Sequence, residues 1–362
     1  MKEGWEYKSL GEVCEILDSR RKPITKNKRE SGIIPYYGAT GLLDYVKDFI
    51  FDEKLVLLGE DGAKWGAGEN SAYIIEGKSW VNNHAHALRP KRNLLKDELL
   101  VYYLNFSNLL PYITGVTVPK LNQEKMRSIE IPIGPIIEQQ SIVDYLDSAF
   151  AKIDAMKANA EKSLNEAKAL FQASLKEMLE PKEGWEEKAL GEVCKKLFSG
   201  GDAPKDNMAK VPNEEYNIPI YANAAELDGL YGYTNYYRVN EPSVTIAARG
   251  SGIGLVLKRK GAYLPIVRLI VAIPQSFLSV DYLYFALQII GIKSNGSAIP
   301  QLTVPAIKQY RICYPPKYTE QQTIVSTLDS LKSKVDRLQE NYDNISQECD
   351  ALKQAILRQV FE

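Results

Sequence analysis

Two stretches of the chain carry apolar residues at alternating intervals of four and three positions. In residues 318–362 the apolar positions are Ile324, Leu328, Leu331, Val335, Leu338, Tyr342, Ile345, Cys349, Leu352 and Ile356. Residues 136–180 begin the same pattern at Ile142 and shift it by one position from Leu164 onward. A period of 3.5 residues predicts the seam of a coiled coil. We therefore expect two helices, each roughly 65–70 Å long at 1.5 Å per residue, that pack against one another.

The stretches 1–135 and 181–317 have a different pattern. Short runs rich in Leu, Ile and Val are bounded by Gly and Pro, which is typical of strands. The expected strands include residues 55–58, 244–247 and 269–273, and one helix is expected in each stretch, at 96–109 and at 280–290. The pattern predicts a mixed α/β protein in which two globules, 1–135 and 181–317, alternate with two long spacer helices, 136–180 and 318–362.

The chain is a tandem repeat with a shift of about 180 residues. The segment Leu10–Cys14 returns as Leu190–Cys194, and Glu138–Gln140 returns as Glu320–Gln322. The copies agree at their starts and along their helices but diverge in the middle of each globule, which predicts one duplicated scaffold with two different surfaces. Repeat symmetry favours antiparallel helices in a pseudo-two-fold molecule. The alternative is a parallel coiled coil that dimerises the chain.

The composition, 45% hydrophobic and 25% charged, is ordinary for a globular protein. No window holds the ~18 apolar residues of a membrane span, and the first residues lack a signal-peptide core, so we expect a cytoplasmic protein that does not contact a membrane. The net charge of −1 divides into +1 and +4 for the globules and −3 for each helical stretch. The +4 globule is a mild indication of a polyanionic partner.

Signatures of catalysis are missing from the sequence. It contains no Gly-x-x-x-x-Gly-Lys-Ser/Thr phosphate loop and no Asn/Asp-Pro-Pro-Tyr/Phe segment. His84 and His86 could ligate a metal with a third group, but they have no counterpart in the second copy, which favours packing or polar surface. Cys14 and Cys194 are repeat equivalents without a Cys-x-x-Cys pair, which favours core positions. We expect no catalytic residue, no cofactor and no metal.

Each copy contains the same short motifs in the same order. They are Gly-Trp followed by Leu-Gly-Glu-Val, an Ile-Pro-x-Tyr segment (34–37 and 218–221), a strand entering a Gly turn (57–62 and 246–252), a Gly-x-x-x-Pro-x-Leu loop (115–121 and 296–302) and Glu-Gln-Gln. With these motifs and its two coiled-coil helices, the whole chain resembles the specificity subunit of type I restriction–modification systems. One departure is that Glu60 and Asp61 stand where the second copy has Ala248 and Arg249, which inverts the charge of the turn.

The resemblance implies a non-catalytic specificity subunit with two target recognition domains, each of which reads one half of a split, asymmetric site in double-stranded DNA. It also implies that the paired helices space the domains and dock two methyltransferase subunits, through which restriction subunits attach. One alternative is the specificity subunit of a type II system whose partner fuses nuclease and methyltransferase. Another is a coiled-coil scaffold whose globules bind protein or glycan.

The candidate DNA contacts are mostly basic or aromatic residues in expected loops and turns. They are Arg20, Arg21, Lys22, Lys28, Lys64 and Trp65 in the first globule, and Asn235, Tyr236, Arg238, Arg249, Ser251, Lys258, Arg259 and Lys260 in the second. Arg249 is the preferred base reader, because arginine can bind guanine O6 and N7 together. The basic run from Arg20 and the expected hairpin tip at 258–260 suit phosphates. The alternatives are solvated loops for these two segments, a core position for Trp65 and aromatic strand packing for the segment 230–238.

Overall fold

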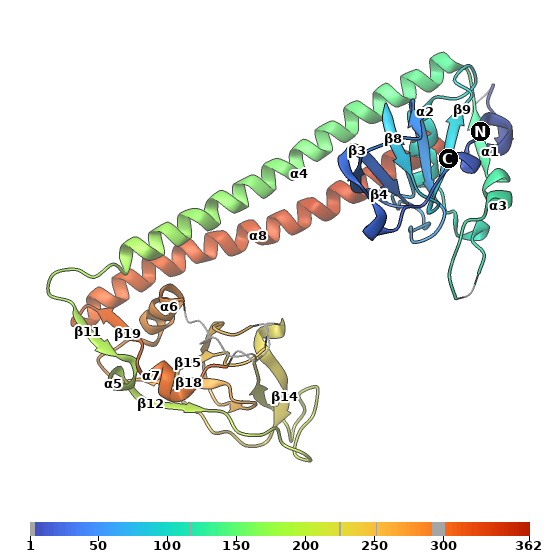
Figure 1. Ribbon diagram of the computed structural model, residues 1–362. Coiled ribbons are helices and arrows are strands. Elements are labelled where there is room, and N and C mark those ends of the chain that lie inside the picture. The colour runs from blue at the N-terminus through green and yellow to red at the C-terminus, as the bar shows by residue number, and fades with distance from the viewer. Residues whose placement is uncertain (1–3, 116, 224–225, 251, 292–300) are drawn as a thin grey trace. The chain divides into compact units, whose positions relative to one another are not determined.

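The computed structural model describes residues 4–115, 117–223, 226–250, 252–291 and 301–362. The chain divides into two compact units, residues 1–161 with 342–362 and residues 162–341. Helix α4 spans Ile136–Met178 and helix α8 spans Tyr318–Phe361, which confirms the prediction of two long helices. Each unit therefore combines one globule with part of each long helix (Figure 1). In the described part of the chain, no helix has the length and hydropathy needed to cross a membrane.

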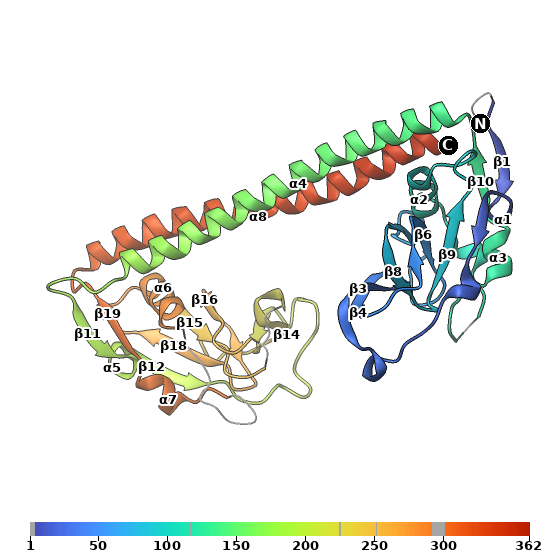
Figure 2. The same ribbon diagram turned by 45° about the horizontal axis from the view of Figure 1, so that its top comes forward.

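Within each unit, α4 and α8 run antiparallel. In the first unit, the early part of α4 lies beside the late part of α8, and Lys353 Nζ lies 2.6 Å from Asp154 Oδ1. In the second unit, the late part of α4 lies beside the early part of α8, and Lys168 Nζ donates to Gln339 Oε1 at 2.7 Å. Figure 2 shows the two helices side by side. These contacts confirm the antiparallel prediction.

Most members of the predicted apolar seam are buried or half-buried. Leu328, Cys349 and Ile153 are among its buried members. Met156 and Leu352 are exceptions, with 58% and 49% of their surface exposed. The 3.5-residue spacing therefore predicts the packed face of each helix correctly except at Met156 and Leu352.

The described residues of the first globule form two four-stranded sheets and one strand pair. The central sheet has the order β2-β9-β6-β7, with all neighbours antiparallel, and the second has the order β4-β3-β8-β5, in which β3 and β8 are parallel. Strands β1 and β10 pair where the chain enters and leaves the globule. The strands are β1 Glu6–Ser9, β2 Cys14–Ile16, β3 Ser31–Gly38, β4 Gly41–Val46, β5 Phe51–Asp52, β6 Leu55–Gly59, β7 Ala72–Ile75, β8 Lys78–Val81, β9 Ala85–Pro90 and β10 Glu130–Ile133. The helices are α1 Leu10–Val13, α2 Asp97–Phe106 and α3 Gln123–Arg127, with 3₁₀ turns η1 Asp18–Arg20, η2 Lys26–Lys28 and η3 Leu110–Tyr112.

The second globule repeats this topology. Its central sheet has the order β12-β18-β15-β16, and β14-β13-β17 includes the parallel pair β13 and β17. The strands are β11 Glu186–Ala189, β12 Cys194–Ser199, β13 Ile218–Tyr221, β14 Leu230–Thr234, β15 Ser243–Ile246, β16 Val256–Arg259, β17 Leu264–Pro265, β18 Ile270–Pro274 and β19 Arg311–Tyr314. The helices are α5 Leu190–Val193, α6 Val280–Ile290 and α7 Val304–Lys308, with the 3₁₀ turn η4 Glu226–Gly229. The prediction of tandem mixed α/β globules is confirmed.

Helices α2 and α6 pack against the central sheets, as shown by buried Leu99 and Leu58 in one core and buried Phe285 and Ile246 in the other. Helix α6 buries residues around its whole circumference because the long helices cover it as well, and the rings of Phe285 and Phe171 of α4 lie 6.5 Å apart. The repeat-equivalent cysteines of the two copies are buried in these cores, and burial raises the pKa of Cys14 and of Cys194 to about 12.

The middle residue of each Glu-Gln-Gln motif joins a long helix to its globule. Gln139 is fully buried, and its amide oxygen accepts from the backbone N–H of Lys96, just before α2, at 3.0 Å. Gln321 accepts in the same way from Ser279, just before α6, at 2.8 Å. A buried amide with satisfied hydrogen bonds fixes the geometry around it. The repeated motif is therefore a structural joint.

Candidate nucleic-acid interface

The basic run of the first globule lies in the loop that contains η1 and η2. Arg20 is held by structural contacts, since its Nη1 lies 3.2 Å from Glu53 Oε1 and its guanidinium lies 4.4 Å from the centre of the Phe51 ring. Lys22 and Lys28 are exposed, and neither forms an ion pair with another residue of the described chain. Exposed ammonium groups of this kind suit phosphate contacts, which need charge but no fixed geometry.

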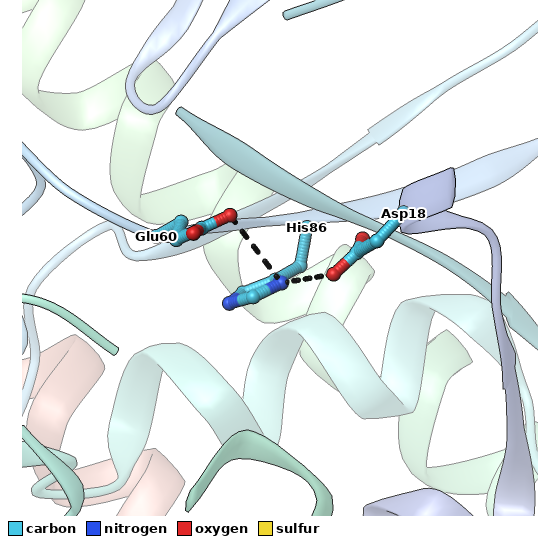
Figure 3. Close-up of side chains that lie close together, drawn as sticks. All are labelled: Asp18, Glu60 and His86. Carbon is cyan, nitrogen blue, oxygen red and sulfur yellow. Dashed lines mark hydrogen bonds and ion pairs between the residues drawn. The ribbon is translucent and has the colours of Figure 1, made fainter. Parts of the chain in front are cut away.

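Arg21 belongs to a largely buried group of charges that links three loops. Figure 3 shows three members of this group, Asp18, Glu60 and His86. Its guanidinium lies 3.2 Å from Asp18 Oδ2 and 2.5 Å from Glu60 Oε2. Lys120 Nζ lies 2.7 Å from the other Glu60 oxygen, and His86 Nδ1 lies 2.6 Å from Asp18 Oδ2. We call these five residues the ionic cluster. It joins the basic loop, the Gly turn after β6 and the loop that ends at residue 121.

The two carboxylates of the ionic cluster are held in the ionised form. Burial alone would raise the pKa of Asp18, but the hydrogen bond and charge of His86, together with Arg21, outweigh burial and lower it. Burial also opposes ionisation of Glu60, and its bonds to Lys120 and Arg21 lower its pKa below the ordinary value. The acidic side chain at the Gly turn is therefore neutralised inside the globule. The inverted charge seen in the sequence does not create a free acidic group at Glu60.

Asp18, Glu60 and His86 place one ligand atom each within 4.8 Å of one another, a geometry that a metal ion could use. The surrounding charges do not favour a cation, because Arg21 and Lys120 already pair with the carboxylates. Both ring nitrogens of His86 are engaged in hydrogen bonds, Nε2 with the carbonyl oxygen of Leu121 at 2.7 Å and Nδ1 with Asp18 Oδ2 at 2.6 Å, so neither is left for a metal ion. The cluster is better described as an ion-paired joint between loops than as a metal site.

The two candidates after Gly62 differ in exposure. The Lys64 side chain is 80% exposed, with a weak contact of 3.9 Å to Glu69. Trp65 is buried in the core, and its indole N–H donates to the carbonyl of Gly59 at 3.0 Å. This corrects the prediction that Trp65 offers a stacking group, since a ring inside the core has no free face for a base. Its role is to hold the turn against α2.

Arg249 lies on the turn after β15, in the place predicted for it. It is exposed, and its Nη2 donates to Gln301 Oε1 at 3.2 Å. Gly250 follows with a φ of +76°, a conformation that glycine adopts without strain. Ser251, also predicted as a DNA contact, lies outside the described residues. Arg249 is therefore accessible to a ligand on this turn.

The segment 258–260 is not a hairpin tip. Lys258 and Arg259 lie in β16, and Lys258 Nζ lies 2.9 Å from Asp281 and 3.2 Å from Asp329. Arg259 is buried, and its guanidinium lies 3.7 Å from the centre of the Tyr221 ring; burial lowers its pKa. Only Lys260 is exposed beyond the strand end. The prediction placed the turn two residues too early, because the basic run hid the alternation of the strand.

The polar candidates Asn235, Tyr236 and Arg238 lie in the exposed loop after β14. Arg238 packs its guanidinium over the Phe198 ring at 4.6 Å and donates to the carbonyl of Ser199 at 3.2 Å. The alternative of aromatic packing within a strand applies to the residues before this loop, which form β14. All three candidates stay accessible to a ligand.

Sequence reasoning missed Lys120. It precedes the leucine of the repeated Gly-x-x-x-Pro-x-Leu motif, and its equivalent Gln301 precedes Leu302 in the second copy. Lys120 contacts Glu60 in the turn after β6, and Gln301 contacts Arg249 in the equivalent turn after β15. The position before the motif's leucine was therefore the available signal. In the second copy, residues 296–300 of this motif lie outside the described residues.

Comparison with protein families gives one match that covers both copies. The model for the type I restriction modification DNA specificity domain matches residues 2–166 and again 182–347. These two matches cover most of the chain and follow the internal repeat.

Individual relatives agree with the family match. A chain named as a type I specificity subunit in Mycoplasma pneumoniae is 29% identical over 332 residues, which cover 89% of this chain and 88% of that one. A second chain so named in the same organism is 30% identical over 301 residues, covering 80% of this chain and 87% of that one.

Solved structures share the fold. A chain from a structure concerned with complex assembly and conformational transition of the type I R-M system has a TM-score of 0.76 at 19% identity, over 100% of this chain and 98% of that one. The HsdS subunit of Thermoanaerobacter tengcongensis has a TM-score of 0.55 at 18% identity, over 100% of this chain and 97% of that one.

Proposed function

The chain belongs to the type I restriction modification DNA specificity family, and from this premise we propose that it recognises a bipartite, asymmetric target in double-stranded DNA. Each globule reads one half of the target. Methylation, and cleavage where restriction subunits are present, are carried out by partner subunits. The second globule contributes Arg249 to base recognition, and exposed lysines such as Lys22 and Lys28 contact phosphates.

The observation that carries this proposal is that the two globules share one strand topology but have different residues in the turns that follow equivalent strands. The central sheets have equivalent strand orders, β2-β9-β6-β7 and β12-β18-β15-β16. The turn after β6 holds Glu60 and Asp61, whereas the turn after β15 holds Ala248 and Arg249. Because sequence in DNA is read by side chains at base edges, two globules with different turns select different half-sites.

Replacing residues 1–135 by the corresponding globule of another family member tests this assignment. We expect the methylated motif of the resulting complex to change in one half and to stay unchanged in the other. The measurement is sequencing of methylated positions in a host that carries the swapped chain with its methyltransferase. An unchanged motif would rule out a reading role for the first globule.

The long helices are proposed to set the distance between the half-sites, because two readers on one side of B-DNA must lie about one helical turn, ~34–36 Å, or a multiple of it apart. Both α4 and α8 pass through both units. Four residues inserted after Glu161 and four after Asn341 would lengthen both helices by about 6 Å. We expect a changed gap between the half-sites of the methylated motif. An unchanged gap would mean that the helices do not set the distance.

Two repeat-related grooves support the docking of two methyltransferases on the chain. In the first unit, a groove of about 860 Å³ lies between α2 and the long helices; in the second unit, a groove of about 370 Å³ lies beside α6. Residues separated by 182 positions line both grooves, namely Tyr102 and Tyr284, Phe150 and Lys332, and Gln354 and Gln172. Native mass spectrometry of the complex should give two methyltransferases per chain. A single methyltransferase would contradict equivalent docking sites.

A further inference from the structure

We propose that Arg268 binds a DNA backbone phosphate beside the base that Arg249 reads, so that the two arginines act as one anion-binding pair. This inference rests on the proposed function and names a contact that the sequence patterns did not indicate. The strand registers show which positions of the two copies are equivalent.

Arg249 and Arg268 occupy the positions that are equivalent to an ion pair of the first copy, Asp61 with His84. Cys14 faces Pro90 and Cys194 faces Pro274, so Arg268, six residues before Pro274, is equivalent to His84.

The turn positions follow from a second pair of contacts. The N–H of Leu121 donates to the carbonyl of Glu60 at 2.8 Å, and the N–H of Leu302 donates to that of Ala248 at 2.9 Å. Arg249 is therefore equivalent to Asp61. In the first copy these positions form the ion pair between His84 and Asp61.

The same two turns are joined in the second copy by Asn223. Its side-chain oxygen accepts from the N–H of Ala248 at 2.7 Å, and its side-chain N–H₂ donates to the carbonyl of Val267. In the first copy the join is direct, from the N–H of Glu60 to the carbonyl of His84 at 2.8 Å. Asn223 therefore keeps the turn of Arg249 next to the turn of Arg268.

The charge of the second pair is not balanced. Arg268 and Arg249 are both exposed, and among the described residues neither forms an ion pair with a carboxylate. Arg238 approaches the same region, because it donates to Ser199, two residues from Gly201, whose carbonyl accepts from the N–H of Val267 at 2.7 Å. Neighbouring cations without a carboxylate are the donor set that proteins offer to phosphate groups.

The backbone holds Arg268 in an unusual conformation. Val267 and Arg268 have φ angles of 52° and 65°, and the N–H of Leu269 closes the turn on the carbonyl of Ile266 at 3.0 Å. A β-branched residue rarely adopts a positive φ. Asn83 and His84, the equivalents in the first copy, are not among the residues with positive φ. Backbone strain of this kind is found at ligand-binding sites, where the surrounding contacts impose it.

Arg268→Gly tests the proposal, because glycine accepts the positive φ of this position and the variant loses the arginine side chain without added backbone strain. The complex of the full chain with its methyltransferase is titrated with a 40-bp duplex of arbitrary sequence between about 50 and 200 mM salt. We expect the slope of log affinity against log salt to fall by about 0.9, with affinity reduced for every duplex sequence. The melting temperature should be kept or raised, which a merely structural role would not allow. Arg268→Lys should retain the slope.

His84→Ala is the matched control at the equivalent position of the first copy, and it should leave the slope unchanged. A wild-type slope for Arg268→Gly would overturn the inference, while a motif change on swapping residues 1–135 would still uphold the proposed function. A loss confined to certain sequences would also overturn it, since it would make Arg268 a base reader. A wild-type complex that binds no duplex would overturn both.

Discussion

The two globules share a strand order but balance their charges in different places. The first globule buries an ionic cluster in which Glu60 pairs with Arg21 and His86 is hydrogen-bonded to Asp18. At the equivalent positions the second globule has Ala248 and Ile270, both buried and apolar. Arg249 and Arg268 of the second globule lie instead on exposed turns. A duplicated scaffold can therefore keep the order of its strands while charged side chains move from an internal joint to exposed turns.

The largest expected effect concerns the ionic cluster. Glu60→Ala, which installs the residue of the second copy, would leave Arg21 and Lys120 without their shared carboxylate. Loss of one partner from a buried ionic network costs about 3 kcal/mol of unfolding free energy. Hydrogen exchange should show weaker protection of β6 and β9 but not of β15 and β18.

The control for this variant is Glu30→Ala, because the pair of Glu30 with Lys47 is exposed on both sides. An exposed pair contributes about 0–1 kcal/mol. Equal destabilisation by the two variants would show that the buried cluster is not a stabilising joint of the first globule.

A second prediction concerns recognition. Arg249→Ala should relax the sequence preference of one half-site, at a cost of about 1–3 kcal/mol in discrimination. Competition binding with duplexes changed in one half-site at a time measures this. Asp61→Ala, the equivalent change in the first copy, should not alter the preference at the Arg249 half-site. Equal weakening on all sequences would reassign Arg249 to a phosphate.

The third prediction concerns the strained turn of the second globule. Val267→Gly should stabilise the second unit by about 1 kcal/mol, since relief of backbone strain of ~1–3 kcal/mol exceeds the entropic cost of glycine. Denaturant unfolding followed by hydrogen exchange at β18 measures the change. Val211→Gly, at an exposed valine without a positive φ, should not stabilise. A destabilised Val267→Gly variant would show that this turn carries no strain.

The smallest expected difference is in acid stability. The pKa values of Asp18 and Glu60 are lowered in the folded state, so their stabilisation is complete above the ordinary carboxyl pKa of about 4 and is lost as pH falls through the lowered values. The first unit should therefore lose protection in acid before the second. The difference is small because burial opposes both shifts. Glu60→Gln should reduce it, and identical acid midpoints for the two units would contradict the prediction.

The sequence predicted which segments contain candidate site residues, but it did not predict which residues those side chains contact. The chain pattern indicated that Arg249 follows a strand and precedes a glycine, and the structure places it there. The same kind of pattern gave a wrong prediction for Lys258 and Arg259. A run of cations in the sequence looks like a solvated turn even where, as for Lys258, acidic partners lie nearby on α6 and α8. Trp65 failed as a stacking group since its neighbours in the core come from distant segments.

The sequence by itself determined the repeat, the two long helices and the strands of the duplicated globules, because the periods of helices and strands are local properties of the chain. Only the tertiary structure decided that Glu60 is neutralised by Arg21 and Lys120, and that Arg268 lies beside the turn of Arg249. These pairings join residues from separate loops, and the sheet register that brings the loops together is fixed by packing of the whole globule. Whether a charged side chain is paired or exposed is therefore decided only once the strands have packed.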